Sequence, residues 1–169
     1  VETGQSETDS QLEVIKANAF EGCSTLSSIK LPSGAKLATV EGEVFKDCIG
    51  LTTIVIPSTV TSIGRNIFYG CKGLLSINIP FVGKNSPVDP LNDEDTKNNY
   101  FTDDSYVLGY FFGYGWATPE NGAINTVQNY APSKTVNVTI PKGLSTVLIG
   151  NQTYMAYGTF SGCSTIQYV

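Results

Sequence analysis

Three consecutive stretches of the chain share one pattern of phenylalanine, cysteine and proline, and this repetition restricts the fold more than any other feature. The stretches are LEVIKANAFEGCSTLSSIKLP (residues 12–32), LATVEGEVFKDCIGLTTIVIP (37–57) and VTSIGRNIFYGCKGLLSINIP (60–80), each 21 residues long without a gap. Their phenylalanines, Phe20, Phe45 and Phe68, are 25 and 23 residues apart, and the cysteines and the final prolines keep the same intervals. A unit this short cannot bury its hydrophobic face alone, so the copies are expected to stack as a solenoid.

Each copy closes with an alternating pattern that predicts a strand. In L-x-x-I-x-I-P the two spaced hydrophobes point to one buried face, and proline, which lacks an N–H group, ends the strand. Strands are therefore expected at residues 28–31, 53–56 and 76–79. Between strands, the segment from Phe to Cys has the length of a single helical turn, and its Phe and Cys, three residues apart, are expected to point inward.

A looser fourth copy is expected at residues 134–169. V-x-I-P at residues 138–141 matches the closing pattern and predicts a fourth strand at residues 137–140. Leu144 and Val147 then match the opening of a copy, and Phe160, Cys163 and Ile166 match its middle. The distance from Val147 to Phe160 predicts a loop lengthened by eight residues. The last match stops before a closing proline, so a longer parent protein or an unusual end cap is expected.

The combined pattern L-x-x-I-x-I-P-x-x-V-x-x-I-G-x-x-x-F-x-x-C resembles the repeat of BspA-like leucine-rich repeat proteins. The resemblance covers residues 12–80 closely and residues 134–169 loosely. It implies a right-handed, mainly β solenoid with short parallel strands on one face and turns or single helical turns on the others. It also implies a secreted or cell-surface protein, of a kind found mainly on bacterial surfaces, that contacts macromolecules of a host or of neighbouring cells.

Residues 81–133 interrupt the repeat. PVDPLNDEDTKNN (87–99) holds four acids and two prolines and predicts an exposed loop. The aromatic run YVLGYFFGYGW (106–116) follows, and its L-G-x-x-F resembles the opening of a copy, which indicates a degenerate repeat. The domain organisation expected is thus a flexible segment at residues 1–11, which carries three acids, and one leucine-rich repeat domain at 12–169.

The charge of the chain argues against a nucleic-acid partner. Ten basic and fifteen acidic residues give a net charge of −5 with no basic cluster, so release of counterions from phosphates cannot drive binding. No run of about 18 apolar residues exists that would insert this segment into a membrane. Charged residues make up only 15% of the chain, which predicts a neutral surface rich in hydroxyl and amide groups.

The residue types of the chain give little support for a catalytic or metal-binding site. The chain has no histidine, which excludes Ser-His-Asp, Cys-His and His-metal arrangements. The four cysteines recur at one repeat position, so they form a ladder for which buried free thiols fit better than disulfides. Acids gather in one polar region, where a solvated loop is favoured over paired catalytic carboxylates or a weak calcium site. Neither a cofactor nor a bound metal is expected.

The candidate partner-binding residues lie in two places. Strand positions that face away from the core form the surface that solenoids use for partners; they are Ser28, Lys30, Thr53, Val55, Ser76, Asn78, Asn137 and Thr139. In the aromatic run, Phe111 and Phe112 are expected in the core, and Tyr110, Tyr114 or Trp116 could lie at a binding face, because exposed Tyr and Trp give a large contact area.

The function expected is a non-enzymatic, extracellular or cell-surface binding module with protein or glycan ligands. A structural spacer within a longer surface protein is the first alternative, and a carbohydrate-binding or carbohydrate-active domain is the second. An enzyme of the last kind would need two carboxylates roughly 5 to 9 Å apart in a cleft.

Overall fold

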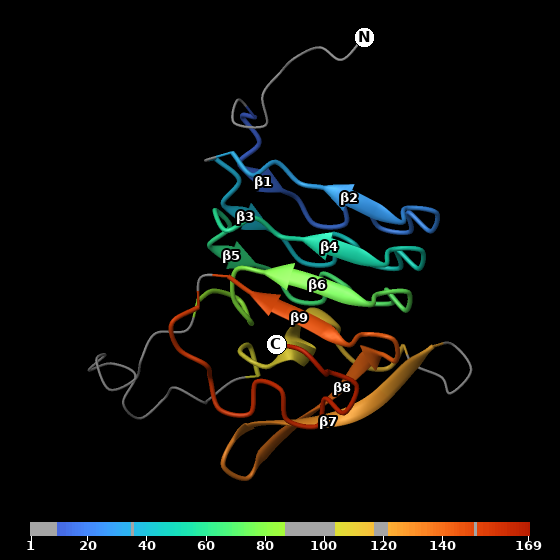
Figure 1. The fold of residues 1–169 in the computed structure, drawn as a ribbon, viewed down its shortest axis with the longest axis vertical. Helices are drawn as coiled ribbons and strands as arrows, with labels where there is room; N and C mark the ends of the chain where they lie inside the picture. The colour runs from blue at the N-terminus through green and yellow to red at the C-terminus, as the bar shows by residue number, and fades with distance from the viewer. Residues whose placement is uncertain (1–9, 35, 87–103, 117–121, 151) are drawn as a thin grey trace.

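The computed structural model describes residues 10–34, 36–86, 104–116, 122–150 and 152–169. In this part the chain winds into a stack of coils, with an antiparallel hairpin at the far end (Figure 1). The main sheet runs through every coil and contains β2 (Ser28–Lys30), β4 (Thr53–Val55), β6 (Ser76–Ile79) and β9 (Thr146–Ile149), all parallel. The leucine-rich repeat solenoid predicted from the sequence is confirmed.

A second parallel sheet, which the repeat pattern did not predict, runs along another side of the stack. It consists of β1 (Val14–Ile15), β3 (Thr39–Val40) and β5 (Ser62–Ile63). Each strand is two residues long, too short for the alternation of a strand to be recognised in the sequence. Ile15, Val40 and Ile63 are buried, so the second sheet closes the core opposite the isoleucines of the main sheet.

A column of aromatic rings fills the centre of the stack. Phe20 lies parallel to Phe45 with ring centroids 5.4 Å apart, and Phe45 lies 6.0 Å from Phe68. The turns that carry these rings also pair through their backbones, because Phe20 N–H donates to Val44 and Phe45 N–H donates to Ile67. Phe45 and Phe68 are fully buried, as the repeat predicted.

Each of these turns reverses the chain at two positions of positive φ. Asn18, Glu43 and Asn66 stand two residues before the phenylalanine, with φ near 60°. Gly22, Asp47 and Gly70 stand two residues after it and are also left-handed. Asparagine and glycine tolerate this conformation best, which explains their recurrence there. A Cβ atom at Gly70 would lie 2.0 Å from a carboxylate oxygen of Asp47, so any larger residue there would require the Asp47 side chain to move.

The fourth strand of the main sheet is not where the sequence pattern placed it. Residues 137–140 belong to β8 (Lys134–Pro141), which pairs antiparallel with β7 (Ala123–Ala131). The sheet continues instead with β9, whose Val147 lies in register with Ile77. Residues 137–140 do form a strand, but its predicted place in the parallel sheet is wrong. The predicted eight-residue insertion is also wrong, because Leu144 and Val147 close a coil and do not open one.

The fourth coil is assembled from three separated segments. Ile63 N–H donates to Lys84, Phe68 N–H donates to Phe111, and β9 pairs with β6. The 3-10 helix η3 (Leu108–Phe111) places Phe111 and Phe112 against Phe68, with ring centroids 6.4 and 5.8 Å away. The prediction that Phe111 and Phe112 are buried is confirmed. The predicted acidic loop at 87–99 lies outside the described residues, as do residues 1–9.

The hairpin formed by β7 and β8 lies across the last coil (Figure 1). The fully buried side chain of Gln128, on β7, joins three segments. The Gly109 N–H of η3 donates to Oε1 of Gln128, while Nε2 donates to Thr159 O at 3.1 Å and lies 3.1 Å from the Cys163 sulfur. Thr126 Oγ1 adds a bond to Gly162 O at 2.8 Å. The hairpin thereby covers this end of the stack.

Removing one ring from the aromatic column tests the register of the repeats. Phe68→Ala is expected to lower the free energy of unfolding by about 3 to 5 kcal/mol, because a fully buried ring in contact with neighbours on both sides leaves a cavity. Phe20→Ala should cost less, because Phe20 is partly exposed at the end of the stack. Urea unfolding followed by circular dichroism measures both. Equal, small losses would contradict the proposed column.

Gln128 tests whether the hairpin is integral to the stack. Gln128→Ala leaves the buried Gly109 N–H and Thr159 carbonyl without their side-chain partner, which is expected to cost at least about 1 to 3 kcal/mol. Asn129→Ala, at the next and exposed position of β7, is the matched control and should be close to neutral. A Gln128 variant as stable as the control would contradict the role of Gln128 in joining the hairpin to the stack.

Candidate functional site

The outer face of the main sheet presents its side chains in rows set by the register of the strands. One row contains hydroxyl groups only and comprises Ser28, Thr53, Ser76 and Thr146. It is extended by Tyr168, which forms a parallel bridge with Thr146. A second row comprises Lys30, Val55, Asn78 and Leu148. Lys30 is the only charged member of the two rows, so the face is nearly neutral.

Large hydrophobic side chains stand exposed on this face. Val55 is 53% exposed, Leu148 46% and Tyr168 65%, and Leu75, the residue before β6, is 52% exposed. When a sheet packs against the core on one face only, the side chains on its outer face are normally polar. Exposed apolar groups on a rigid backbone are typical of a surface that is covered by a partner.

Six of the eight sequence-predicted sheet positions lie on this face. Ser28, Lys30, Thr53 and Val55 are exposed, and Ser76 and Asn78 are half-buried. The other two predictions are wrong. Asn137 is exposed but lies on the hairpin, and Thr139 is fully buried there. Both errors follow from the misplaced fourth strand.

Thr146, Leu148 and Tyr168 belong to the face although the repeat pattern does not predict them. A signal for β9 was present, because Lys142-Gly143-Leu144 precedes it just as Lys72-Gly73-Leu74 precedes β6. The competing V-x-I-P motif in β8 matched the closing pattern of a copy more completely, since β9 is followed by glycine and not by proline.

The three aromatic candidates have different environments. Tyr110 is buried, with its hydroxyl donating to Ile63 O at 3.1 Å and its ring 4.8 Å from the Arg65 guanidinium. It therefore does not form a binding surface. Trp116 is half-buried: its indole N–H donates to Phe112 O at 2.8 Å, and its ring lies 6.2 Å from that of Tyr69. Tyr114 is 55% exposed.

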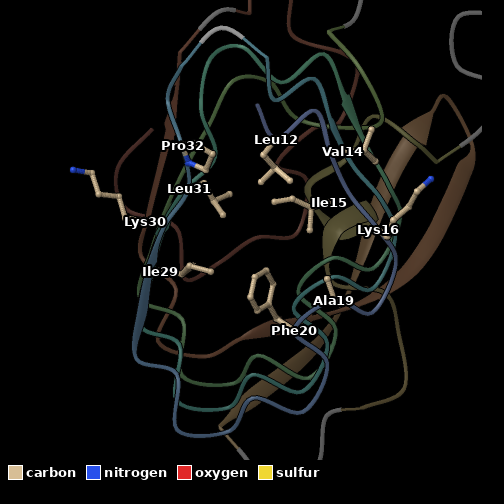
Figure 2. Close-up of a pocket in the computed structure, with 10 residues that line it drawn as sticks. All are labelled: Leu12, Val14, Ile15, Lys16, Ala19, Phe20, Ile29, Lys30, Leu31 and Pro32. Carbon is tan, nitrogen blue, oxygen red and sulfur yellow. The ribbon is translucent and has the colours of Figure 1, made fainter. Parts of the chain in front are cut away.

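The first coil leaves an apolar hollow at the N-terminal end of the stack. The hollow encloses about 360 Å³, and Figure 2 shows Phe20, Ile29 and Ile15 pointing into it, with the amino groups of Lys16 and Lys30 directed away. Its remaining lining residues are Leu12, Val14, Ala19, Leu31 and Pro32. It is the upper surface of the hydrophobic core, and the residues that line it include no carboxylate, hydroxyl or thiol side chain.

The cysteines form the expected ladder of free thiols. Cys48 and Cys71 are buried, and their Sγ–H groups donate to Phe20 O at 3.1 Å and to Phe45 O at 2.9 Å in the preceding coils. Burial raises the pKa of both thiols, and it raises the pKa of Cys163 to about 12. Cys23, in the terminal coil, is exposed.

Within the described residues, side chains that could bind a metal ion do not cluster. No group of three or more His, Cys, Asp or Glu side chains lies close enough there to hold a metal ion. Of the acids in the 89–104 region, Asp104 is described, and it makes a two-point ion pair with Arg65 at 2.5 and 3.1 Å. This carboxylate anchors the interrupted coil to the third repeat.

The comparison with protein families agrees with the repeat pattern. The model of the BspA type leucine rich repeat region matches residues 4–86 in six copies. The chain is thus a leucine-rich repeat protein, and residues 4–86 belong to the BspA type. The chain is similar to a T. pallidum leucine rich repeat protein (TpLRR) of known crystal structure. The two are 33% identical over a match that spans 48% of this chain and 37% of that chain, and the TM-score is 0.40. No curated protein gave a match. In the described part, no helix is long and apolar enough to cross a membrane.

Thiol labelling tests the cysteine ladder. With an aromatic disulfide reagent at pH 8, Cys23 is expected to react fast, whereas Cys48 and Cys71 should react only after unfolding. Burial raises the pKa of both thiols, so they stay protonated at pH 8, and the thiolate is the reactive form. Absorbance gives the rates and peptide mass mapping the sites. Cys23→Ser should remove the fast phase. Labelling of Cys71 at the rate of Cys23 in folded protein would contradict the structure.

Proposed function

We propose that this chain is a non-enzymatic binding module that recognises a protein partner through the outer face of the main sheet. The observation that carries the proposal is the exposure of Val55, Leu148 and Tyr168 on that face. Leucine-rich repeat regions typically bind proteins, which supports the same assignment.

The sheet supplies a rigid and extended surface. Its strands are paired to neighbours along the whole stack, and Ile54, Ile77 and Val147 on their inner side are buried. Binding of a partner would therefore cost little conformational entropy in the backbone of this sheet. Preorganisation of this kind raises affinity. The row of hydroxyl groups beside the apolar side chains offers donors and acceptors for a polar rim.

The chemistry of the face favours a partner surface that is apolar and nearly uncharged. Lys30 is the only ionic group in the two outward rows, and it stands on the first strand of the sheet. Long-range charge attraction therefore contributes little, and burial of apolar area is the main favourable term. Proteins of the extracellular matrix or of neighbouring cell surfaces are the proposed class of ligand.

The proposed location is extracellular or at a cell surface. The similarity to BspA type repeats supports it, because these proteins are typically secreted or surface-exposed. The buried thiols are compatible with an oxidising compartment, since a protonated and inaccessible cysteine forms disulfides slowly.

A structural spacer remains the second candidate function. The hollow at the N-terminal end favours it, because a further coil of the same repeat stacked on Phe20 and Ile29 would continue the core. In that role the outer sheet face would have no partner of its own.

Charge substitutions on the sheet face test the binding proposal. Purified protein is titrated by biolayer interferometry against a panel of extracellular-matrix proteins, and saturable binding to at least one is expected. Val55→Asp and Leu148→Asp should each weaken it by more than about 1 kcal/mol, because a carboxylate at a desolvated contact is costly.

Val127→Asp is the matched control, since Val127 is similarly exposed but lies on the hairpin. Its affinity should equal that of the unmodified protein. Absence of saturable binding across the panel, or equal affinity of all three variants, would refute the sheet-face site and favour the spacer.

A further inference from the structure

The turn from Gly113 to Trp116 carries a second exposed surface, separate from the main sheet. Tyr114 stands between two glycines of positive φ, Gly113 at 67° and Gly115 at 91°. More than half of Tyr114 is exposed, and its hydroxyl has no hydrogen-bond partner within the described part of the chain. The ring is thus not needed to build the core, which Phe111 and Phe112 already fill.

The backbone of this turn is held rigidly by the hairpin. Thr139 N–H donates to Gly113 O at 2.7 Å, and Gly115 N–H donates to the Thr139 hydroxyl oxygen at 3.1 Å. The bond from the Trp116 indole to Phe112 fixes the end of the turn. Thr139 is fully buried, so its hydroxyl is not exchanged for water. The two glycines and these bonds present Tyr114 to solvent in one backbone conformation.

An amide group stands next to the turn and completes the surface. The Thr139 hydroxyl donates to Oδ1 of Asn125 at 2.6 Å, across the paired strands β7 and β8. Because Oδ1 is engaged inward, the Nδ2 group of the exposed Asn125 has both N–H donors available, and no described residue accepts from them. Asn125 and Gly115 share one hydroxyl group as partner, so the free amide and the turn of Tyr114 are neighbours.

We propose that Tyr114, Trp116 and Asn125 form a binding site for a neutral carbohydrate. An exposed aromatic ring offers its face to the C–H groups of a pyranose, while a free amide donates to sugar hydroxyls, and neither group selects for charge. The network that joins the turn to Asn125 through Thr139 contains only hydroxyl, amide and backbone groups. A site of this composition suits an uncharged oligosaccharide, and it is independent of the proposed protein contact on the sheet.

The single tryptophan of the chain makes the test direct. Trp116 is the only source of indole fluorescence, so its emission reports on this site alone. The intact protein is titrated separately with cellohexaose, laminarihexaose, mannohexaose and chitohexaose. The expected result is a saturable change in emission with at least one of them, and no saturable change with an acidic hexagalacturonate.

Two variants assign the effect to the proposed groups. Tyr114→Ala is expected to weaken binding about tenfold, through loss of the ring contact. Asn125→Asp keeps the oxygen that accepts from Thr139 and replaces the outward donors, and it should weaken binding by a factor of about three or more. Tyr157→Ala and Asn129→Ala, which change exposed residues outside the site, are matched controls and should leave affinity unchanged. Thermal melts confirm that each variant is folded.

Three results would overturn the carbohydrate site. The first is no saturable change with any neutral hexasaccharide, and the second is binding that Tyr114→Ala leaves intact. The third is an extracellular-matrix protein, but no oligosaccharide, that loses affinity in Tyr114→Ala, which would make the turn a protein contact. Val55→Asp should not alter oligosaccharide binding, so failure here and failure of the sheet-face proposal are distinguishable.

Discussion

Stacking of coil upon coil is the constraint on which the rest of this structure depends. Strands of two to four residues cannot persist alone, and each is stabilised because the next coil pairs with its backbone and covers its hydrophobic side chains. The phenylalanine column, the isoleucine rows and the thiol-to-carbonyl bonds of Cys48 and Cys71 all repeat at the spacing set by this pairing. Phe45 and Phe68 each contact the aromatic ring of the preceding coil and that of the following coil.

Each coil pairs directly with the coil before it, and for this reason the stack tolerates large interruptions in the sequence. The fourth coil is divided by the 87–103 segment and by the hairpin, yet its three parts still find the backbone groups and rings of the third coil. The interruption has a structural use. The hairpin covers the last coil through Gln128, so the apolar surface at this end is not left open as it is around Phe20.

The same geometry separates the two candidate surfaces. The outer sheet face belongs to the repeats, and its side chains are free to vary because the inner row alone maintains the core. The turn around Tyr114 belongs to the inserted segments, where backbone bonds to Thr139 replace repeat pairing. Thus the regular part offers a broad and shallow contact, and the irregular part offers a small and rigid one.

The sequence by itself determined the repeat, the three strands at β2, β4 and β6, the inward phenylalanines and the burial of Cys48 and Cys71, because each depends on a pattern within 21 residues. It also indicated that the aromatic run would join the stack. Only the tertiary structure decided between β9 and the V-x-I-P segment of β8, since both have strand-like alternation and local patterning does not specify the pairing partner. The position of Thr139, buried and bound to the Tyr114 turn, and the free amide of Asn125 also depend on that choice. Register between distant segments is set by which combination buries the most apolar surface and satisfies the most backbone groups, a property of the whole chain and not of any one repeat.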